Sequence, residues 1–449
     1  MPELEQLASF VLRPSGHLPP TALRAARRVL LDSVGAILAG TTTDAVAHLL
    51  DDLAPPAGAA TLIGRDRTAW PAYAAFVNGT AMVSLELDEG NQWSRGHPAA
   101  HVVPAALAAA EEAHAGGAAL LEAIAYGYEV AARFGRASSL RPDVHTHGTA
   151  GNAGAAAAVA RLRALDADST AAAMRLAVAL STPTAWDTAL RGDLVRNLYM
   201  GRAGAVGVLA PALVGAGFGA GPDAERHVLG RILGSAFDPG ALVEGLGGQW
   251  EIERNYFKFY AFCRYAHSPI QAAFDLTAAE AIAPEEVEAV EVRTFARAST
   301  LGRTDPDNML AAKFSIPYAV GSVLVRGRAD QSAFSAEAMA DPRVRALARR
   351  VRLVDEPDHD SRYPDQMVAT VTVRLADGRV VERTCSEAKG SPNRPPSDEE
   401  LAEKFRTLAA YALAGRAEEA LALVRQLEAA DDVAETMGRL RVLCRHERS

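Results

Sequence analysis

The stretch Leu85–Pro104, LELDEGNQWSRGHPAAHVVP, interrupts a chain that otherwise reads as an ordinary helical protein. An apolar, alanine-rich segment runs into three carboxylates, including Glu86 and Asp88, and a polar loop then leads to His97 and Pro98. Proline suits the first position of a helix because its missing N–H would be unpaired there in any case. We therefore predict that one helix ends at the acids and that the next begins at Pro98. The acids and the histidine can then converge on one small volume, which the rest of the chain would enclose.

The composition is that of a globular protein. The 449 residues are 49% hydrophobic and 22% charged, and a chain of this length favours two domains. A formal net charge of -9 argues against nucleic acid as a partner. We expect no membrane partner and a cytoplasmic location, because the sequence shows neither a membrane-spanning apolar run nor a secretory signal. The three cysteines are too scattered for a disulfide framework or a zinc motif.

Apolar residues recur at helical spacing through the first half of the chain. Alanine and leucine dominate these segments, and glycine and proline fall mostly between them, which favours a tightly packed bundle. The predicted helices cover residues 21–40, 70–87, 98–115, 117–135, 149–164, 169–181 and 199–217.

After about residue 265 the pattern changes to alternating apolar and polar residues, which is typical of half-buried strands. The clearest example, residues 367–385, contains the hairpin turn signal Asp377-Gly378. The other elements expected in this half are strands at 288–295 and 351–354 and helices at about 268–283, 308–324 and 398–445.

These patterns predict a mainly α protein. Residues 1–265 and 398–449 are expected to form a large all-α helical domain from both chain ends. Residues 266–397 are expected to form an inserted α+β lid domain. A small domain inserted in a larger one is well placed to cover a site between the two.

Two further segments place polar residues near helix starts. His145 and His147 precede a glycine-rich helix start, where backbone N–H groups can bind a carboxylate. Arg196 and Arg202 lie at the start of the 199–217 helix, and arginine forks bind carboxylates in a bidentate way. The alternatives are loop or capping histidines and arginines on a solvated helix face.

Lys258 is one of only four lysines among 46 basic residues, and it lies in the aromatic segment NYFKFYAFCRYAH at 255–267. Desolvation there would lower its pKa toward the range of an acid-base group. His267 ends the same segment. The later segment AAKFSIPY at 311–318 adds Lys313 and Tyr318, which carry little signal on their own.

A metal site is not predicted. His97 and His101 are four residues apart, but the chain has no HExxH motif, and Pro98 keeps His97 off the regular helical face.

Taken in order, these motifs resemble the MmgE/PrpD family over nearly the whole chain. The segments that carry the resemblance are LELDEG, HPAAHVVPAALAAAE, HTHGTAGNAG, GRAGAVG, KFYAFCRYAH and AKFSIPY. The resemblance implies a helical domain with an α+β lid, a site between them, homodimers, and chemistry on a small polycarboxylate without a cofactor. It implies a lyase that removes water or CO2, or an epimerase that uses the same proton abstraction.

The resemblance also implies site residues. Glu86 and Asp88 match the family's aspartate-rich DFDD stretch, and His97 matches its HP histidine. His145 falls on the histidine of the FHPT pattern, and Lys258 on the lysine of K-x-Y-x-x-C. The sequence departs from the family at ELDE, at VHTH and at Arg196, where a lysine is usual. The predicted catalytic residues are His145, Lys258, His97, Asp88 and Tyr318, and the predicted substrate-binding residues are Glu86, Arg196, Arg202, His147 and His267.

Water loss, CO2 loss and epimerisation next to a carboxylate all need a base near the carbon-bound proton and cations or N–H donors for the developing charge. We assign proton transfer to His145 and Lys258, with His97 and Tyr318 as nearby donors. Glu86 or Asp88 would orient a histidine and raise its basicity. A non-catalytic helical binding protein with structural histidines is the alternative from a different class.

Overall fold

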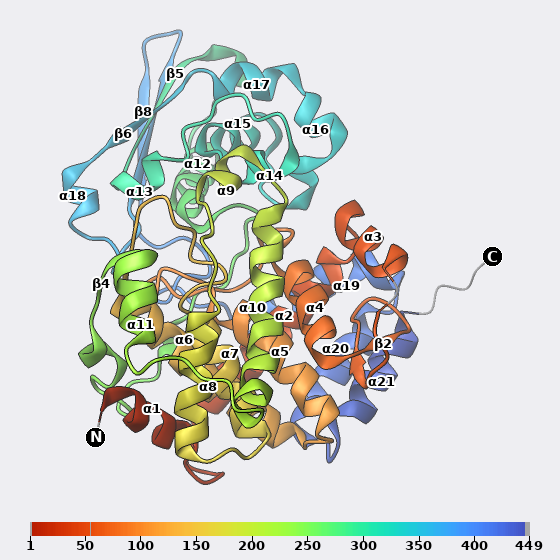
Figure 1. Ribbon diagram of the computed structural model, residues 1–449. Coiled ribbons are helices and arrows are strands. Elements are labelled where there is room, and N and C mark those ends of the chain that lie inside the picture. Colours follow the sequence, from red (N-terminus) through yellow and green to blue (C-terminus); the bar gives the residue numbers. More distant parts are fainter. Residues whose placement is uncertain (1, 54, 445–449) are drawn as a thin grey trace.

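The computed structural model describes residues 2–53 and 55–444, so residues 1, 54 and 445–449 of the predicted helical domain lie outside the described part of the chain. Helices predominate, and the largest sheet has four strands. Figure 1 shows a large helical part in the lower half of the view and a smaller part with the sheet above it. The protein is therefore mainly α, as predicted.

One large hydrophobic core holds the helical part together. Its main helices are α1 (Glu3–Val11), α2 (Pro20–Gly40), α3 (Asp44–Asp52), α4 (Pro71–Val83), α5 (Pro98–Glu112), α6 (Gly117–Ala137), α7 (Asn152–Leu162), α8 (Ala167–Ala179), α10 (Val195–Gly215), α19 (Asp398–Leu413), α20 (Ala417–Gln426) and α21 (Val433–Leu443). The core takes in buried side chains from Leu4 to Phe257 and from Leu401 to Cys444. Because α19 packs on α2 and α21 packs on α5, both chain ends build the same core (Figure 1).

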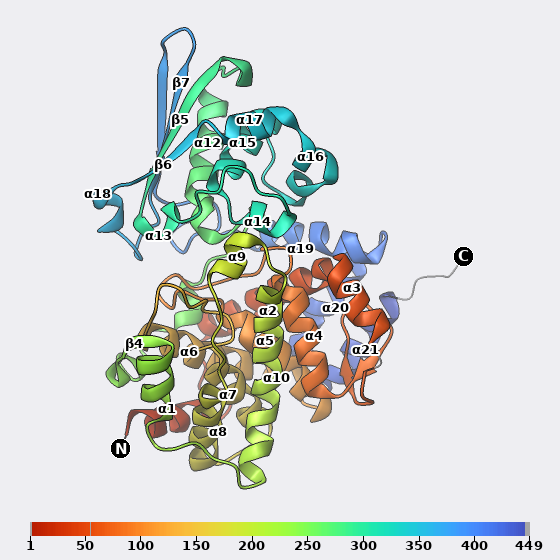
Figure 2. The same ribbon diagram turned by 45° about the horizontal axis from the view of Figure 1, so that its top comes forward.

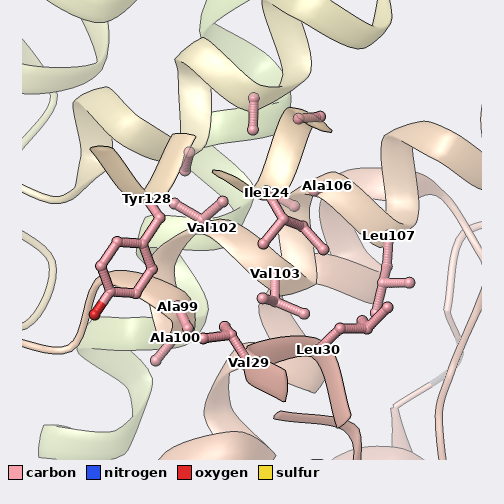
Figure 3. Close-up of a cluster of buried hydrophobic side chains, with 14 of the residues drawn as sticks. Val29, Leu30, Ala99, Ala100, Val102, Val103, Ala106, Leu107, Ile124 and Tyr128 are labelled. Carbon is pink, nitrogen blue, oxygen red and sulfur yellow. The ribbon is translucent and has the colours of Figure 1, made fainter. Parts of the chain in front are cut away.

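Figure 3 shows a section of this core in which side chains from three helices meet. Val29 and Leu30 of α2 face Val103 and Leu107 of α5, and Ile124 of α6 lies beside them. All five side chains are almost completely buried. The helical period of the apolar residues is therefore satisfied by packing on neighbouring helices.

A second core lies in the α+β part. Its strands are β5 (Val287–Thr294), β6 (Val351–Asp355), β7 (Ala369–Leu375) and β8 (Val380–Cys385), and its main helices are α12 (His267–Ala279), α15 (Ile316–Arg326) and α17 (Pro342–Ala348). The strand order is β6-β5-β7-β8, with β5 parallel to β6 and antiparallel to β7. Helix α12 packs on β7 and β8, and Figure 2 shows the helices of this part beside the sheet. The predicted hairpin is confirmed, with Gly378 at φ 86° in its turn.

The remaining elements are short connections. They comprise β1 (Ala60–Thr61), β2 (Thr68–Ala69), β3 (Ser138–Leu140), β4 (Gly234–Phe237), α9 (Asp187–Arg191), α11 (Ala224–His227), α13 (Ala296–Ser299), α14 (Met309–Lys313), α16 (Ala336–Ala340) and α18 (Pro357–Asp360). The helix predicted over 308–324 is in fact α14 and α15. The break falls at Phe314 and Ser315, because the Ser315 hydroxyl caps α15 by accepting the Tyr318 N–H at 3.0 Å.

Helix α10 is long and apolar enough to span a membrane by length and composition. It packs against α4, α5, α7 and α8, and half of its most apolar stretch is buried. It therefore serves as a core helix of a globular protein. Figure 2 shows that its first turn points toward the α+β part.

Small residues let the helices approach closely. A Cβ atom added to Gly154 of α7 would lie 2.3 Å from the Gly127 carbonyl oxygen of α6 and 2.5 Å from the Ala131 Cβ. These distances are too short for any side chain, and the nearest atom belongs to the backbone of a packed helix. Contact between α6 and α7 therefore depends on glycine at this position.

We predict that Gly154→Ala lowers the free energy of unfolding by about 1–3 kcal/mol, because α6 and α7 must separate to admit the methyl group. Gly438→Ala in α21 is the matched control, since a Cβ there meets no atom within 4 Å. Alanine favours a helix over glycine by about 1 kcal/mol, so the control should be neutral or stabilised. Urea denaturation measures both, and equal stability of the two variants would contradict the packing argument.

Candidate active site

The residues between α4 and α5, 84–97, form a mostly buried loop that we call the acidic loop. Helix α4 ends at Val83 rather than at 87 as predicted, and Glu86 has a left-handed backbone with φ 56°. Gly90 and Tyr256 form a short antiparallel bridge, with N–H to carbonyl distances of 3.1 and 2.8 Å. This bridge brings the segment that carries Lys258 beside the acidic loop.

Three of the four lysines bind the acidic loop. Lys258 Nζ lies 3.0 Å from Glu86 Oε2 and 3.3 Å from Asp88 Oδ1. Lys313 donates to the Leu85 carbonyl oxygen at 3.1 Å, and Lys404 donates to the Leu87 carbonyl oxygen at 2.7 Å. All three ammonium groups are buried, and we call them together the lysine clamp. The clamp fixes the backbone and both carboxylates of residues 85–88.

The expected pKa of Lys258 is wrong in direction. Burial does lower the pKa of this ammonium, but Asp88 and Glu86 together outweigh burial and raise it above its usual value. In return, Lys258 and His97 hold the pKa of Asp88 well below its usual range against the effect of burial. Lys258 is therefore a permanently charged partner of two carboxylates, and it is poorly suited to transfer protons.

Asp88 and His97 form a carboxylate–histidine pair. His97 Nδ1 lies 2.7 Å from Asp88 Oδ2 and 2.7 Å from the Glu89 carbonyl oxygen. Both neighbours are acceptors, so Nδ1 carries the hydrogen, and Nε2 is the acceptor when the ring is neutral. The hypothesis that an acid of this loop orients a histidine therefore agrees with the position of Asp88.

Glu89 has a different role from the other two acids. Its carboxyl group accepts the Ala99 N–H and the Tyr128 hydroxyl, each at 2.8 Å, at the start of α5. Burial raises the pKa of Glu89 to about 8, so the group is neutral at pH 7. Glu89 thus satisfies the helix start without adding charge beside Asp88.

His145 has the opposite hydrogen-bonding arrangement to His97. The His147 N–H lies 3.1 Å from His145 Nδ1, and since an amide can only donate, Nδ1 accepts. The ring hydrogen is therefore on Nε2, which has no partner among the described residues. Burial, then the nearby Arg196 and His97, hold the pKa of His145 well below 6.5, so the ring is neutral at pH 7.

Arg196 and His147 complete the buried cluster. Arg196 Nη2 forms an ion pair with Glu86, and Nη1 donates to the Val83 carbonyl oxygen at 3.1 Å. Arg196 was expected to hold a substrate carboxylate, but its Nη2 already pairs with a protein carboxylate, and only Nε has no hydrogen-bond partner among the described residues. The His147 ring lies between His97 and His145, with centroid distances of 5.0 and 4.3 Å.

A cavity of about 50 Å³ lies against these residues. Four of the predicted site residues line it, namely Glu86, His97, His145 and Arg196. Asp88, Lys258 and His147 are not in its lining but contact residues that are. The apolar part of the wall comes from Trp186, Phe314, Tyr363 and Met367.

Three predicted site residues are outside this cavity. The Tyr318 hydroxyl donates to the Ala333 carbonyl oxygen at 2.6 Å in the core of the α+β part. His267 Nε2 lies 3.1 Å from the Phe262 carbonyl oxygen. Arg202 donates to Thr182 Oγ1 at 3.1 Å and to the Leu180 carbonyl oxygen beyond the end of α8. The Tyr318 hydroxyl and the Arg202 guanidinium are therefore used in contacts within the protein, whereas His267 Nδ1 has no hydrogen-bond partner among the described residues.

At the glycine-rich helix start, the Gly148 N–H is already bonded within the protein. Gly148 donates its N–H to His101 Nε2 at 3.2 Å. A Cβ atom on Gly151 would lie 2.6 Å from the His101 ring. Gly148 therefore binds the His101 ring, and Gly151 makes room for it.

Arg95, Arg264 and Arg297 also line the cavity, and the sequence did not predict them. Arg264 lies in the aromatic segment 255–267, in which only Lys258 and His267 were predicted as site residues. Arg95 and Arg297 are exposed, and nothing in their local sequence separates them from other surface arginines. Among the described residues no group of three histidine, cysteine, aspartate or glutamate side chains is arranged to hold a metal ion.

We predict that Lys258→Met lowers the free energy of unfolding by about 3–5 kcal/mol, because it leaves Glu86 and Asp88 buried without their shared cation. Lys389→Met is the matched control. Lys389 pairs with Glu400 at 3.0 Å on the surface, and loss of such a pair costs about 1 kcal/mol or less. Guanidinium denaturation measures the free energy of unfolding of both variants. An equal loss in the two would contradict the proposed role of the lysine clamp.

Comparisons with known proteins show the family of the chain. The MmgE/PrpD N-terminal domain model matches residues 5–227, and the MmgE/PrpD C-terminal domain model matches residues 260–429. Cis-aconitate decarboxylase of Homo sapiens is 27% identical over 444 residues, which cover 93% of this chain and 90% of that protein. Cis-aconitate decarboxylase of Aspergillus terreus is 25% identical over 428 residues, with 87% and 86% covered. The two domain models together span most of the sequence, and the chain belongs to the MmgE/PrpD family.

Proposed function

We propose that the protein is a cofactor-independent lyase that acts on a small polycarboxylate, and that it removes CO2 rather than water. The observation that carries the proposal is a pair of imidazoles with opposite hydrogen-bonding roles, His97 and His145, on one cavity with several guanidinium groups. Membership of the family and the cis-aconitate decarboxylase relatives support a lyase of this class.

His97 is the group suited to move a proton. Its Nδ1–H is held by Glu89 and Asp88, and the ionised Asp88 stabilises the charged ring as in other carboxylate–histidine pairs. Nε2 is then the atom that gives or takes a proton. This assignment replaces Lys258, whose ammonium is bound to two carboxylates.

His145 is suited to donate a hydrogen bond rather than a proton. A neutral imidazole with its hydrogen on Nε2 can stabilise negative charge on a carboxylate oxygen, and it would become imidazolate if it gave the proton away. The site therefore has one proton-transfer group and one neutral donor. Dehydration needs both a base and an acid, and epimerisation needs proton-transfer groups on two faces of the substrate. Decarboxylation needs only one proton-transfer group, so the two histidines favour decarboxylation.

In the proposed reaction a carbon–carbon bond to one carboxylate breaks and CO2 leaves. The electron pair moves into the adjacent unsaturated carboxylate, where the His145 Nε2–H and an arginine stabilise the charge. Charged His97 then delivers one proton to carbon, and solvent restores that proton. Substrate and one proton thus give product and CO2.

Substrate entry requires the site to open. A cavity of about 50 Å³ has room for a few water molecules, whereas ligand pockets commonly measure about 300 Å³ or more. The helical part contributes His97 and His145, and the α+β part contributes Arg297 and Met367. We propose that the α+β part moves as a lid over the helical part.

The homodimer and the cytoplasmic location stay predictions.

We predict that the purified protein converts cis-aconitate, or a related unsaturated polycarboxylate, with CO2 release and incorporation of one solvent deuterium in D2O. His97→Asn and His145→Asn should each lower kcat by about 10²–10⁴-fold, because proton transfer or charge stabilisation is lost. His114→Asn is the matched control, since His114 forms a similar pair with Asp432 at 2.8 Å on the surface. Proton NMR follows substrate and product.

Failure of a panel of unsaturated and hydroxylated polycarboxylates to react would contradict the proposal. Release of water without CO2 would instead support the hydro-lyase alternative. Near-normal rates in both active-site histidine variants would show that the assigned groups are wrong.

A further inference from the structure

Three arginines in the described part of the chain are almost completely buried, Arg133, Arg196 and Arg264. Arg133 Nε lies 2.6 Å from Glu129 Oε1, and Arg196 pairs with Glu86. Arg264, with 5% of its surface exposed, has no carboxylate within 4.0 Å among the described residues. A buried charge without a counter-charge is unfavourable, so its presence needs a reason.

The guanidinium of Arg264 is held in place by uncharged groups. Nη2 donates to Ser391 Oγ at 2.7 Å, and the group stacks on the Tyr256 ring at 4.6 Å from the centroid. Ser391 is itself buried, and its neighbour Gly390 accepts the Phe257 N–H at 2.9 Å. The side chain is thus oriented from two sides, which is typical of a group kept ready for a ligand.

Two nitrogens of Arg264, Nε and Nη1, have no hydrogen-bond partner in the described structure. The residue lines the same cavity as His97 and His145. Glu387 lies nearby but beyond ion-pair distance, and it accepts the Asn393 side-chain amide at 2.9 Å. Free donors on a buried cation that lines a cavity fit an anionic ligand.

The charges around the cavity lead to the same conclusion. The two ionised carboxylates, Glu86 and Asp88, are matched by Arg196 and Lys258. Three arginines that line the cavity are in excess of this balanced set, and Arg264 is the buried one, whereas Arg95 and Arg297 are exposed. Burial lowers the pKa of the Arg264 guanidinium, because the charged form is removed from water.

We infer that Arg264 is a substrate-binding residue that holds a second carboxylate of the substrate, separate from the one that reacts beside His97, and that Ser391 positions it. The inference rests on the proposed function and narrows it. The ligand class is a compound with at least two carboxylates close enough to reach both Arg264 and the imidazole pair. A monocarboxylate would leave one of these groups unpaired.

The test measures unfolding temperature and ligand binding for wild type and Arg264→Met. The probes are propane-1,2,3-tricarboxylate and, for comparison, butyrate. Without ligand, Arg264→Met should unfold at the same temperature as wild type or higher, because an unpaired buried charge is removed. With the tricarboxylate, wild type should bind and gain stability, and the variant should bind at least 10-fold more weakly by calorimetry.

Two further variants separate ligand binding from a structural role. Arg254→Met is the control, since Arg254 stacks on Trp93 at 3.5 Å and its Nε also forms no hydrogen bond, but it pairs with Glu251 at 3.7 Å and does not line the cavity. It should keep wild-type affinity. Ser391→Ala should raise KM several-fold with little change in kcat, and Ser391→Thr, which keeps the hydroxyl, should restore KM.

The outcomes distinguish this inference from the proposed function. If wild type neither binds nor converts any polycarboxylate, the proposed function is contradicted. If wild type binds the tricarboxylate and Arg264→Met binds it equally well, only the role of Arg264 is overturned. A variant that unfolds well below wild type without ligand would show instead that Arg264 is structural. Butyrate should bind weakly to both proteins, and equal affinity of wild type for butyrate and the tricarboxylate would also overturn the inference.

Discussion

The lysine clamp on the acidic loop is the constraint on which the site depends. Lys313, Lys258 and Lys404 come from three distant parts of the sequence, yet they bind residues 85 to 88 in turn. Buried carbonyls and carboxylates need partners, and an ammonium group supplies three donors from a compact charge. The clamp therefore allows two ionised acids to remain buried beside each other. It also joins α19 and the α+β part to the loop that carries Asp88.

From this loop the proton positions on two histidines follow. Asp88 and the Glu89 carbonyl oxygen fix the hydrogen of His97 on Nδ1, whereas the His147 amide fixes that of His145 on Nε2. The two imidazoles thus take opposite roles. The difference comes from hydrogen-bond partners and not from residue type, which is why a shared cavity can hold both an acceptor and a donor.

The sequence predicted the elements better than the contacts of individual side chains. Pro98 marks the start of α5, and the alternation at 367–385 gives the hairpin β7–β8, because local backbone preferences decide both. The convergence of Asp88, His97, His145 and Lys258 also agrees with the expectation. The order of these groups around the cavity depends on long-range packing, which a linear pattern does not encode.

The particular errors have the same origin. Lys258 looked like a lysine with a lowered pKa because its aromatic neighbours are visible in sequence, whereas the two carboxylates that raise the pKa are about 170 residues away. Tyr318 carries a family motif, but its hydroxyl is used inside the α+β core. Arg264 was not predicted as a site residue, because its unpartnered nitrogens are visible only in three dimensions.

The central claim is that the acidic loop and its neighbours hold His97 and His145 in opposite tautomers around one cavity. Nitrogen-15 NMR of histidine-labelled protein, with assignments from His97→Asn and His145→Asn, tests it directly. When both rings are neutral, we predict a protonated Nδ1 for His97 and a protonated Nε2 for His145. The same tautomer on both rings, or a His145 ring that is charged at pH 7, would contradict the account.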